Sequence, residues 1–328
     1  MTNEIISGGV SVIIPVYNRP RQLRDAVLSA ARQSLRPLEI LVVDDGSTDE
    51  TASIAQELAS DFSPLIRVIR QPNGGPGLAR EAGRQAALGE YLQYLDSDDV
   101  LYARKFELQI AALAEAPSSA ACYGPVRYRY ADGKLADDPI KLTGRVIPRM
   151  FPSFLADRWW STHAPLWRRK VTDEAGPWTD LRIHEDWEYD CRIAASGATL
   201  CCVGEDVAEV RQSLEGHGKR FDRNKLRDRA RAHELIFGHA KADGIALDCR
   251  ESLAFSNASF LLCRECAAVG LLAEAQTLWK ITCDSAPPIW SKQFPRKVFG
   301  ALSRGFGFRV AGLVSLLAEK GHNPRRRV

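Results

Sequence analysis

Short apolar runs alternate with helical patterns over the first hundred residues, and this alternation constrains the fold more than any other feature of the chain. Four runs have the length of strands: 10–16, 38–43, 66–70 and 91–95. Helical patterns fill the intervals: 20–33, 50–59 and 78–87. The first two runs are almost wholly apolar and rich in Val and Ile, as in strands that are covered on both faces. This order predicts an α/β fold with a mostly parallel central sheet and helices on both faces.

Polar residues gather at the points where these predicted strands end. Tyr17 and Asn18 follow the first strand, Asp44 and Asp45 end the second, and the acidic segment 96–99 (DSDD) follows the fourth. Ligands of open α/β sheets bind beyond the carboxyl ends of the strands. The strand ends are therefore the candidate functional site.

The segment 96–99 offers carboxylate oxygens for a metal ion. Asp96 and Asp98, one residue apart at a strand end, could both reach a hard divalent cation such as Mg²⁺ or Mn²⁺, which commonly bridges to substrate phosphates. A solvated acidic loop, or an N-cap for the helix expected at 101–114, explains the same residues without a metal. The segment by itself leaves both interpretations open.

The other polar segments are equally ambiguous. A carboxylate at the position of Asp44 can accept from an imide N–H of a base, but Asp and Gly are also common in turns. The backbone around Gly75 could approach a ligand closely, and the fork of Arg80 suits phosphate oxygens. None of these features identifies a function alone.

Four segments together resemble glycosyltransferase family 2 in their order and intervals. They are SVIIPVYNR at 11–19, VVDDGSTDET at 42–51, NGGPGLARE at 73–81 and YLDSDD at 94–99. The resemblance extends over about residues 10–215. It implies the GT-A fold, a Rossmann-like arrangement, and an inverting transfer of sugar from a nucleotide-diphosphate sugar with the help of Mn²⁺ or Mg²⁺.

The resemblance also implies roles for individual residues. The nucleotide-sugar donor would contact Pro15, Tyr17, Asn18, Asp44, Asp45, Gly75, Arg80, Asp96 and Ser97. Within this set Asp44 would hold a uracil-type base, and Asp45 would support the loop. Asp98 would bind the cation, with Asp96 reaching the ribose, a metal-bound water or the cation itself.

The segment 184–187 (HEDW) matches the Glu-Asp motif of the family. The resemblance implies that Asp186 is the general base, because an acceptor hydroxyl must lose its proton as it attacks the anomeric carbon. A helix-capping role for this carboxylate is the alternative. Glu185 and the aromatic residues Trp159, Trp160 and Trp187 are candidates for acceptor contacts, with core packing as the alternative for the tryptophans.

The chain departs from the family pattern at one position. Many members that transfer a single sugar carry a histidine near the metal where this chain has Ser213. His217 is then the candidate third metal ligand, unless it belongs to a plain surface loop. The chain lacks the Gln-x-x-Arg-Trp motif of processive synthases and has no run of about 18 apolar residues. We therefore expect one sugar to be transferred per encounter.

The expected catalytic domain covers residues 1–220, with a donor half at 1–100 and an acceptor half at 101–220, and a helical region follows at 221–328. The segment 291–328 contains nine Lys or Arg residues against one acid, Glu319, among many apolar residues. A basic amphipathic helix suggests peripheral contact with an anionic membrane, and packing on the catalytic domain is the alternative.

Charge and cysteine content limit the classes of function. A net charge of +3 does not require a nucleic-acid partner, and none is expected. Among eight cysteines only Cys263 and Cys266 have metal-like spacing, but they lie in an apolar helical pattern, which favours a structural role. The N-terminus has no basic region followed by an apolar one, so a cytoplasmic protein is expected.

The leading hypothesis is a metal-assisted transfer from a UDP-type donor to a carbohydrate or a lipid-linked glycan, in the synthesis of bacterial surface polysaccharide or another glycan. One rival is a catalytically silent sugar-nucleotide-binding or scaffold protein. The other is a sugar-1-phosphate nucleotidyltransferase, which would require a Gly-rich phosphate loop where this chain has VYNRP at 16–20.

Overall fold

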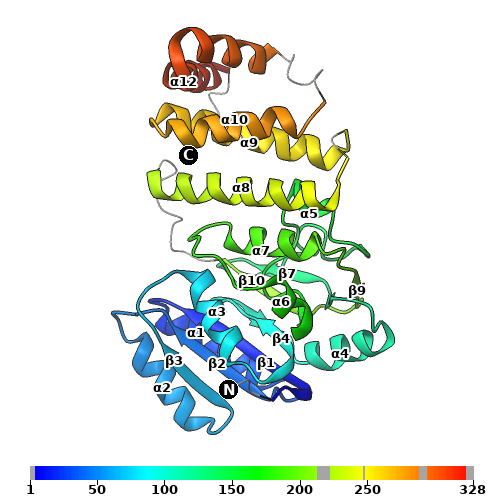
Figure 1. The fold of residues 1–328 in the computed structure, drawn as a ribbon. Coiled ribbons are helices and arrows are strands. Elements are labelled where there is room, and N and C mark those ends of the chain that lie inside the picture. Colours follow the sequence, from blue (N-terminus) through cyan, green and yellow to red (C-terminus); the bar gives the residue numbers. More distant parts are fainter. Residues whose placement is uncertain (1–3, 213–221, 247, 288–293, 323–328) are drawn as a thin grey trace. The chain divides into compact units, whose positions relative to one another are not determined.

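The computed structural model describes residues 4–212, 222–246, 248–287 and 294–322 (Figure 1). The chain forms two compact units. The sheet unit comprises Met1–Met150, Trp159–Asp180 and Gly197–Gly216, and the helical unit comprises Phe151–Arg158, Leu181–Ser196 and His217–Val328. Each unit is described by itself.

The sheet unit contains a central sheet of seven strands in the order β3-β2-β1-β4-β8-β6-β9. The strands are β1 (Ile6–Val16), β2 (Glu39–Asp44), β3 (Ile66–Arg70), β4 (Gly89–Tyr94), β6 (Ala121–Tyr123), β8 (Leu166–Arg168) and β9 (Leu200–Cys202). The first four are parallel, while β8 runs antiparallel to both of its neighbours, β4 and β6. The predicted mostly parallel α/β sheet is confirmed. A second sheet pairs three strands: β5 (Val100–Leu101), β10 (Ala208–Arg211) and β7 (Val126–Arg129).

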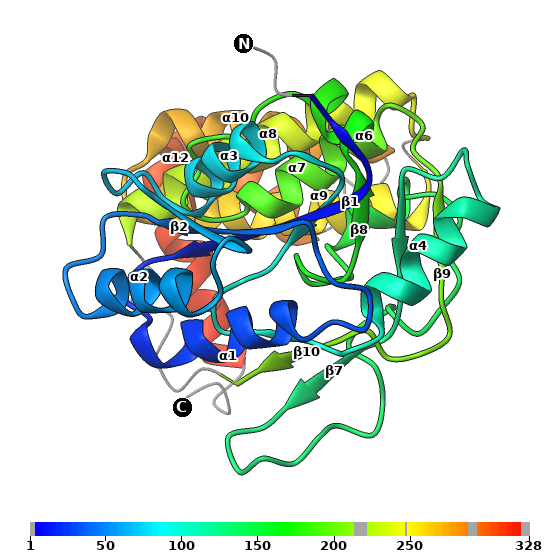
Figure 2. The same cartoon turned by 90° about the horizontal axis from the view of Figure 1, so that it is seen from below.

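Helices cover both faces of the central sheet. They are α1 (Pro20–Ala31), α2 (Thr51–Asp61), α3 (Pro76–Ala86), α4 (Lys105–Glu115) and α6 (Arg169–Ala175). The chain moves outward from β1 to β3 through α1 and α2, then returns across the sheet to β4 through α3. Because such crossovers are right-handed, the reversal places α3 on the face opposite to α1 and α2 (Figure 2). The reversal lies between β1 and β4, where open sheets bind their ligands.

Local sequence explains where α1 begins and which side it buries. Pro20 occupies the first turn, where its missing N–H costs nothing. The buried residues are the four that the helical period predicts: Leu23, Ala26, Val27 and Ala30. On the other face α3 approaches β1 so closely that a Cβ added at Gly83 would lie 2.4 Å from Cγ2 of Ile13.

The helical unit contains six described helices. They are α5 (Ser153–Ala156), α7 (Glu185–Ala194), α8 (Arg223–Asp243), α9 (Arg250–Ala268), α10 (Leu272–Asp284) and α12 (Phe294–His322). The predicted helical hairpin around Gly270, which has φ 78°, is formed by α9 and α10. In Figure 1, α8, α9 and α10 lie side by side.

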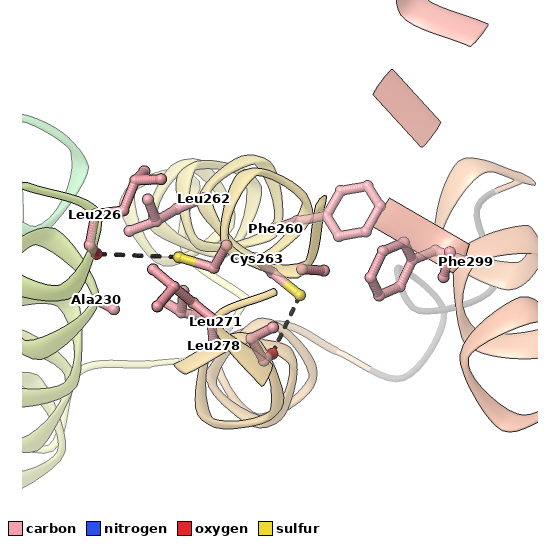
Figure 3. Close-up of a cluster of buried hydrophobic side chains, with 12 residues drawn as sticks. Leu226, Ala230, Phe260, Leu262, Cys263, Leu271, Leu278 and Phe299 are labelled. Carbon is pink, nitrogen blue, oxygen red and sulfur yellow. Dashed lines mark hydrogen bonds between the residues drawn. The ribbon is translucent and has the colours of Figure 1, made fainter. Parts of the chain in front are cut away.

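The core of this unit settles the role of the two closely spaced cysteines. Cys263 and Cys266 are buried, and their thiols face backbone carbonyls of Ala275 (3.2 Å) and Leu226 (3.9 Å) (Figure 3). Burial raises the pKa of both thiols, that of Cys266 to about 12. All eight cysteines are free. The predicted structural role of Cys263 and Cys266 is confirmed, because both side chains are part of the buried core of this unit.

The division of the chain differs from the boundary expected at residue 220. Both α5 and α7 group with the C-terminal helices and not with the sheet. The ring of Trp187 in α7 lies 5.5 Å from that of His233 and 6.1 Å from that of Phe255. These aromatic contacts with α8 and α9 explain the grouping.

Candidate functional site

The loops that follow β1 and β2 are tied together by Asn18. This residue has a left-handed backbone (φ 51°), and its N–H donates to Oγ of Ser47 (3.1 Å). Its side-chain oxygen accepts the N–H of Thr48 (2.9 Å). Tyr17 beside it is 45% exposed, whereas Pro15 is buried within β1. Tyr17 and Asn18 are therefore open to a ligand, and Pro15 shapes the strand that carries them.

Asp45 holds the glycine loop in front of α3. Its two carboxylate oxygens accept the N–H groups of Gly74 and Gly75, each at 2.8 Å, and one also accepts from the side chain of Gln71. Gly75 has φ 91° and ψ 169°, a conformation that suits glycine. This is the loop-supporting contact that the family resemblance implied for Asp45.

Asp44 is fully buried at the end of β2. One oxygen accepts the N–H of Ser47 (2.9 Å), and the other lies 3.2 Å from Nε of Arg70. The carboxylate therefore shapes the turn at 44–47. Its implied contact with a uracil-type base stays a prediction.

Each carboxylate of the acidic segment lies beside one basic side chain. Asp96 pairs with Arg80 (2.7 Å) and Asp98 pairs with Arg19 (2.6 Å). Oδ2 of Asp99 lies 3.1 Å from Nδ1 of His163, which is completely buried. The segment is not the N-cap of the next helix, because α4 begins at Lys105 and Arg104 precedes it as the cap.

Arg80 forms an ion pair with Asp96 in this structure. The arginine is only 4% exposed, and its guanidinium lies 5.0 Å from the ring centre of Trp178. The ring and the carboxylate together hold the guanidinium in place. In this structure Asp96 is the group that Arg80 orients, and the implied contact of Arg80 with a phosphate stays a prediction. Ser97, also part of the expected donor site, is 8% exposed.

The surroundings of Asp98 disfavour the ionised form of its carboxyl group. Burial raises the pKa of its carboxyl, as do the charges of Asp99 and Asp96, while the guanidinium of Arg19 opposes them. Clustered carboxylates of this kind are relieved by a cation.

The residues present fit a divalent cation. Ligand atoms of Asp96, Asp99 and His163 all lie within 4.8 Å of one another. The expected ligands were Asp98, Asp96 and His217. In the structure Asp96 belongs to this group of possible ligands, and Asp98 lies in the same loop. His217 lies outside the described residues.

From the sequence, His163 was expected to have a structural role or to line the site near the tryptophans, and it was not connected with the acidic segment. A lone histidine far from the acidic segment in the chain carries no motif. The pairing of β8 with β4, through Leu92 and Trp167, brings it to the site, and Gln93 of β4 donates to its carbonyl (3.1 Å). Asp99 is fixed from a third direction, because it accepts the N–H of Arg211 (3.0 Å).

Asp186 lies in the first turn of α7 in the helical unit. One oxygen accepts the N–H of Trp187 (2.7 Å), and the other lies 2.9 Å from Nη1 of Arg158. Nε of Arg158 donates to Asp190 (2.7 Å). The cap position itself is taken by His184. The side chain of Asp186 is 27% exposed, so a carboxylate oriented by Arg158 still meets solvent.

The expected acceptor platform of tryptophans is wrong. Trp159 and Trp160 are each 2% exposed and Trp187 is 9% exposed, whereas stacking on a sugar needs an open ring face. Trp159 packs against Tyr123, and the indole N–H of Trp187 donates to the carbonyl of Phe154 (2.6 Å). Core packing, the alternative, accounts for all three. Glu185 is 6% exposed, so an acceptor has little access to it.

Comparisons with known proteins agree with these motifs. Residues 11–166 match the family model described as Glycosyl transferase family 2. An uncharacterized glycosyltransferase of Rickettsia felis is 42% identical over 106 residues, which are 32% of this chain and 17% of that protein. The uncharacterized protein Rv1520 of Mycobacterium tuberculosis is 28% identical over 251 residues, 72% of this chain and 71% of that protein. The chain thus matches only a small part of the first relative's length.

Two solved structures share the fold. Staphylococcus aureus TarS in complex with UDP-GlcNAc has a TM-score of 0.68 at 16% identity, covering 97% of this chain and 93% of that one. The mannosyltransferase PcManGT from Pyrobaculum calidifontis, in complex with GDP-Man and Mn²⁺, has a TM-score of 0.50 at 19% identity. The match covers 95% of this chain and 87% of that one. These likenesses confirm the predicted GT-A fold. Since the family model matches residues 11–166, including the strands that carry its motifs, this part of the chain belongs to glycosyltransferase family 2.

Proposed function

We propose that the protein transfers a single sugar from a nucleotide-diphosphate sugar, UDP-linked, to an acceptor hydroxyl with inversion at the anomeric carbon. The observation that carries the proposal is the grouping of Asp96, Asp99 and His163 beyond the end of β4, at the reversal of strand order. Family membership supports the reaction class, and the complex of TarS with UDP-GlcNAc supports the class of donor.

A divalent cation belongs in this site. Asp96, Asp99 and His163 would hold it, with Asp98 as the further carboxylate of the same loop. A set that includes an imidazole suits Mn²⁺ better than Mg²⁺, which prefers oxygen ligands. When bound, the cation supplies positive charge for the diphosphate leaving group. The Mn²⁺ complex of PcManGT supports this choice.

Residues of the chain itself orient the carboxylates of the site and deprotonate the acceptor hydroxyl. Arg80 and Arg19 hold the carboxylates of Asp96 and Asp98. Asp186 accepts the proton of the acceptor hydroxyl while the oxygen of that hydroxyl bonds to the anomeric carbon and the bond from this carbon to the diphosphate breaks. The products are the glycosylated acceptor and a nucleoside diphosphate. Arg158 is a positioning residue, because it holds both Asp186 and Asp190.

The acceptor in this proposal is a carbohydrate or a lipid-linked glycan on the cytoplasmic side of a bacterial membrane, in the synthesis of surface polysaccharide or another glycan. The eight free cysteines are consistent with a reducing compartment. The rival nucleotidyltransferase chemistry gains no support, because Asn18 and the tight turn after β1 stand where its phosphate loop would be.

A thermal-shift panel of nucleotide sugars, with and without Mn²⁺, tests the donor and metal site. One UDP-sugar should raise the unfolding temperature in the presence of Mn²⁺, since a ligand at about 100 times its Kd adds about 2.7 kcal/mol of stability. Asp98→Ala and His163→Ala should lose this shift, while Asp138→Ala, at an exposed carboxylate of the same unit, should keep it. No shift with any donor would contradict the proposal.

Release of nucleoside diphosphate tests the base and the silent-protein rival together. Asp186→Asn should abolish release in the presence of acceptor and keep the donor-induced shift. Full turnover in Asp186→Asn would show that another group is the base. A normal donor shift with no release from the wild-type protein, across a panel of acceptors, would favour the silent binding protein.

A further inference from the structure

The second half of α12 packs on α9 through small residues. Ala311 and Gly312 are buried, and a Cβ added at Gly312 would lie 2.6 Å from the backbone nitrogen of Ala268 in α9. Arg264 of α9 also donates to the carbonyl of Ser315 (2.9 Å). The second half of α12 is therefore held closely against α9, because Ala311 and Gly312 leave little side chain between the two helices.

Five large apolar residues of α12 face solvent. We call the following set the outer face: Phe306, Val310, Leu313, Val314 and Leu317, with exposures of 71%, 40%, 47%, 42% and 67%. The last four are spaced as i, i+3, i+4 and i+7, which places them on one side of a helix. A helix of a soluble protein normally has the opposite arrangement. A continuous exposed apolar stripe marks a binding surface.

Basic residues accompany the outer face. Lys297, Arg304 and Arg309 are exposed, and the sequence contains no acidic residue from 294 to 318. The sequence continues with Lys320 and the run 325–327 (RRR), against the single acid Glu319. Apolar side chains among basic ones complement a lipid bilayer with anionic headgroups. Its interior accepts the apolar groups, and its headgroups attract the basic ones.

The geometry favours a helix that lies on a membrane over one that crosses it. The stretch Pro295–Ala318 is long and apolar enough to span by composition, with a mean hydropathy of 1.3 over its window. Gly307, with φ 81° and ψ 161°, interrupts the helix, so that neither half, 294–306 nor 308–322, has the roughly 20 residues that a span requires. The first half is anchored too, because Phe299 is buried against Phe260 (Figure 3). The ring of Trp279 also lies 5.2 Å from that of Phe299.

We propose that the outer face of α12 docks on an anionic lipid bilayer, with its apolar side chains in the interfacial layer and Lys297, Arg304 and Arg309 at the headgroup phosphates. The docking surface is independent of the transfer reaction. Its consequence for the reaction, access to a lipid-linked acceptor, rests on the proposed function.

Vesicle co-sedimentation of the full chain tests the docking surface. The protein should bind vesicles of phosphatidylcholine mixed with phosphatidylglycerol, and bind those of phosphatidylcholine alone much less. Leu313→Ser with Leu317→Ser should weaken binding about tenfold or more, because two apolar side chains no longer enter the interface. Arg304→Gln with Arg309→Gln should remove the preference for anionic vesicles.

A matched control comes from the same unit. Leu261 in α9 and Leu272 in α10 are 50% and 44% exposed, so Leu261→Ser with Leu272→Ser changes similar side chains outside the outer face. Equal vesicle binding by both serine pairs would overturn the proposal. So would a protein that binds no vesicles but changes from dimer to monomer in the Leu313 and Leu317 variant, because the outer face would then bind a second copy.

The donor-induced thermal shift separates this proposal from the proposed function. The Leu313 and Leu317 variant should keep that shift while it loses vesicle binding. If the transferase proposal fails, no donor shift appears, but anionic vesicles should still bind the wild-type protein.

Discussion

Asp98 illustrates a conflict between stability and function at a single residue. It is crowded by Asp96 and Asp99, and the guanidinium of Arg19 opposes their charges. Three carboxylates within one short loop cost stability in the absence of a cation, and such costs are typical of functional sites. Without a cation, the basic partner of each carboxylate holds the loop in place.

The first prediction concerns Asp98→Asn. For an acid whose pKa is raised on folding, ionisation destabilises the fold, and the destabilisation disappears as the pH falls through the folded-state pKa. Asp98→Asn should therefore unfold at the same or a higher temperature than the wild type at pH 8, with a smaller difference in acid. It should also lose stabilisation by Mn²⁺ with a nucleotide sugar.

Thermal denaturation at pH 8 and at acid pH, with and without Mn²⁺, checks this prediction. Asp138→Asn, at an exposed carboxylate, serves as the control. A larger loss of stability at pH 8 than in acid would show that the ion pair with Arg19 outweighs the repulsion.

At the scale of elements, α3 and β1 set how the site is assembled. The glycine loop held by Asp45 leads into α3, and α3 packs on β1, whose end carries Tyr17 and Asn18. The contact is close because Gly83 of α3 has no side chain to separate it from Ile13. The spacing between helix and sheet is therefore controlled by one residue.

Gly83→Ala and Gly238→Ala should change stability in opposite directions. Alanine in a helix interior gains about 1 kcal/mol over glycine. Gly238 in α8 is exposed with no heavy atom within 4 Å of an added Cβ, so this gain should appear in full. At Gly83 the new Cβ meets Ile13 at 2.4 Å, and overpacking of about 1–3 kcal/mol should outweigh the gain.

Urea denaturation of the two variants measures both changes in the free energy of unfolding. The comparison is matched, because the same atoms are added in the middle of a helix. Equal stabilisation by both substitutions would mean that α3 can move away from β1 at no cost.

At the scale of the whole molecule, the chain builds the helical unit from three separate segments. Trp187 of α7 packs on His233 and Phe255, while Phe154 of α5 accepts the indole N–H and is itself fully buried. Asp186, the proposed base, is thus carried by a helix whose packing depends on residues after 220.

A fragment of residues 1–220 should therefore fold incompletely. Without α8 and α9, the apolar sides of α5 and α7 lose their cover, so the fragment should bind the dye ANS and be cleaved by protease within 181–196. The chain 1–322, which keeps every described helix, is the control and should do neither. A fragment 1–220 that resists protease and binds no dye would show that α7 finds enough support without the C-terminal helices.

The sequence by itself determined the local features of this protein. The alternating periods predicted the parallel sheet, the four buried residues of α1 and the hairpin at Gly270, because strand and helix patterns depend on near neighbours. The motif segments likewise identified the family and the acidic loop at 96–99. These features need no knowledge of what packs against them.

Only the tertiary structure decided which distant residues meet. The pairing of β8 with β4 brought His163 to Asp99, burial removed Trp159 and Trp160 from the surface, and α7 joined the C-terminal helices. The sequence of α12 shows apolar and basic residues. Only the contact with α9 shows that the side with Ala311 and Gly312 is buried while the larger apolar residues of the outer face are exposed. A helical period defines faces, whereas the partner of each face depends on topology, which long-range contacts set.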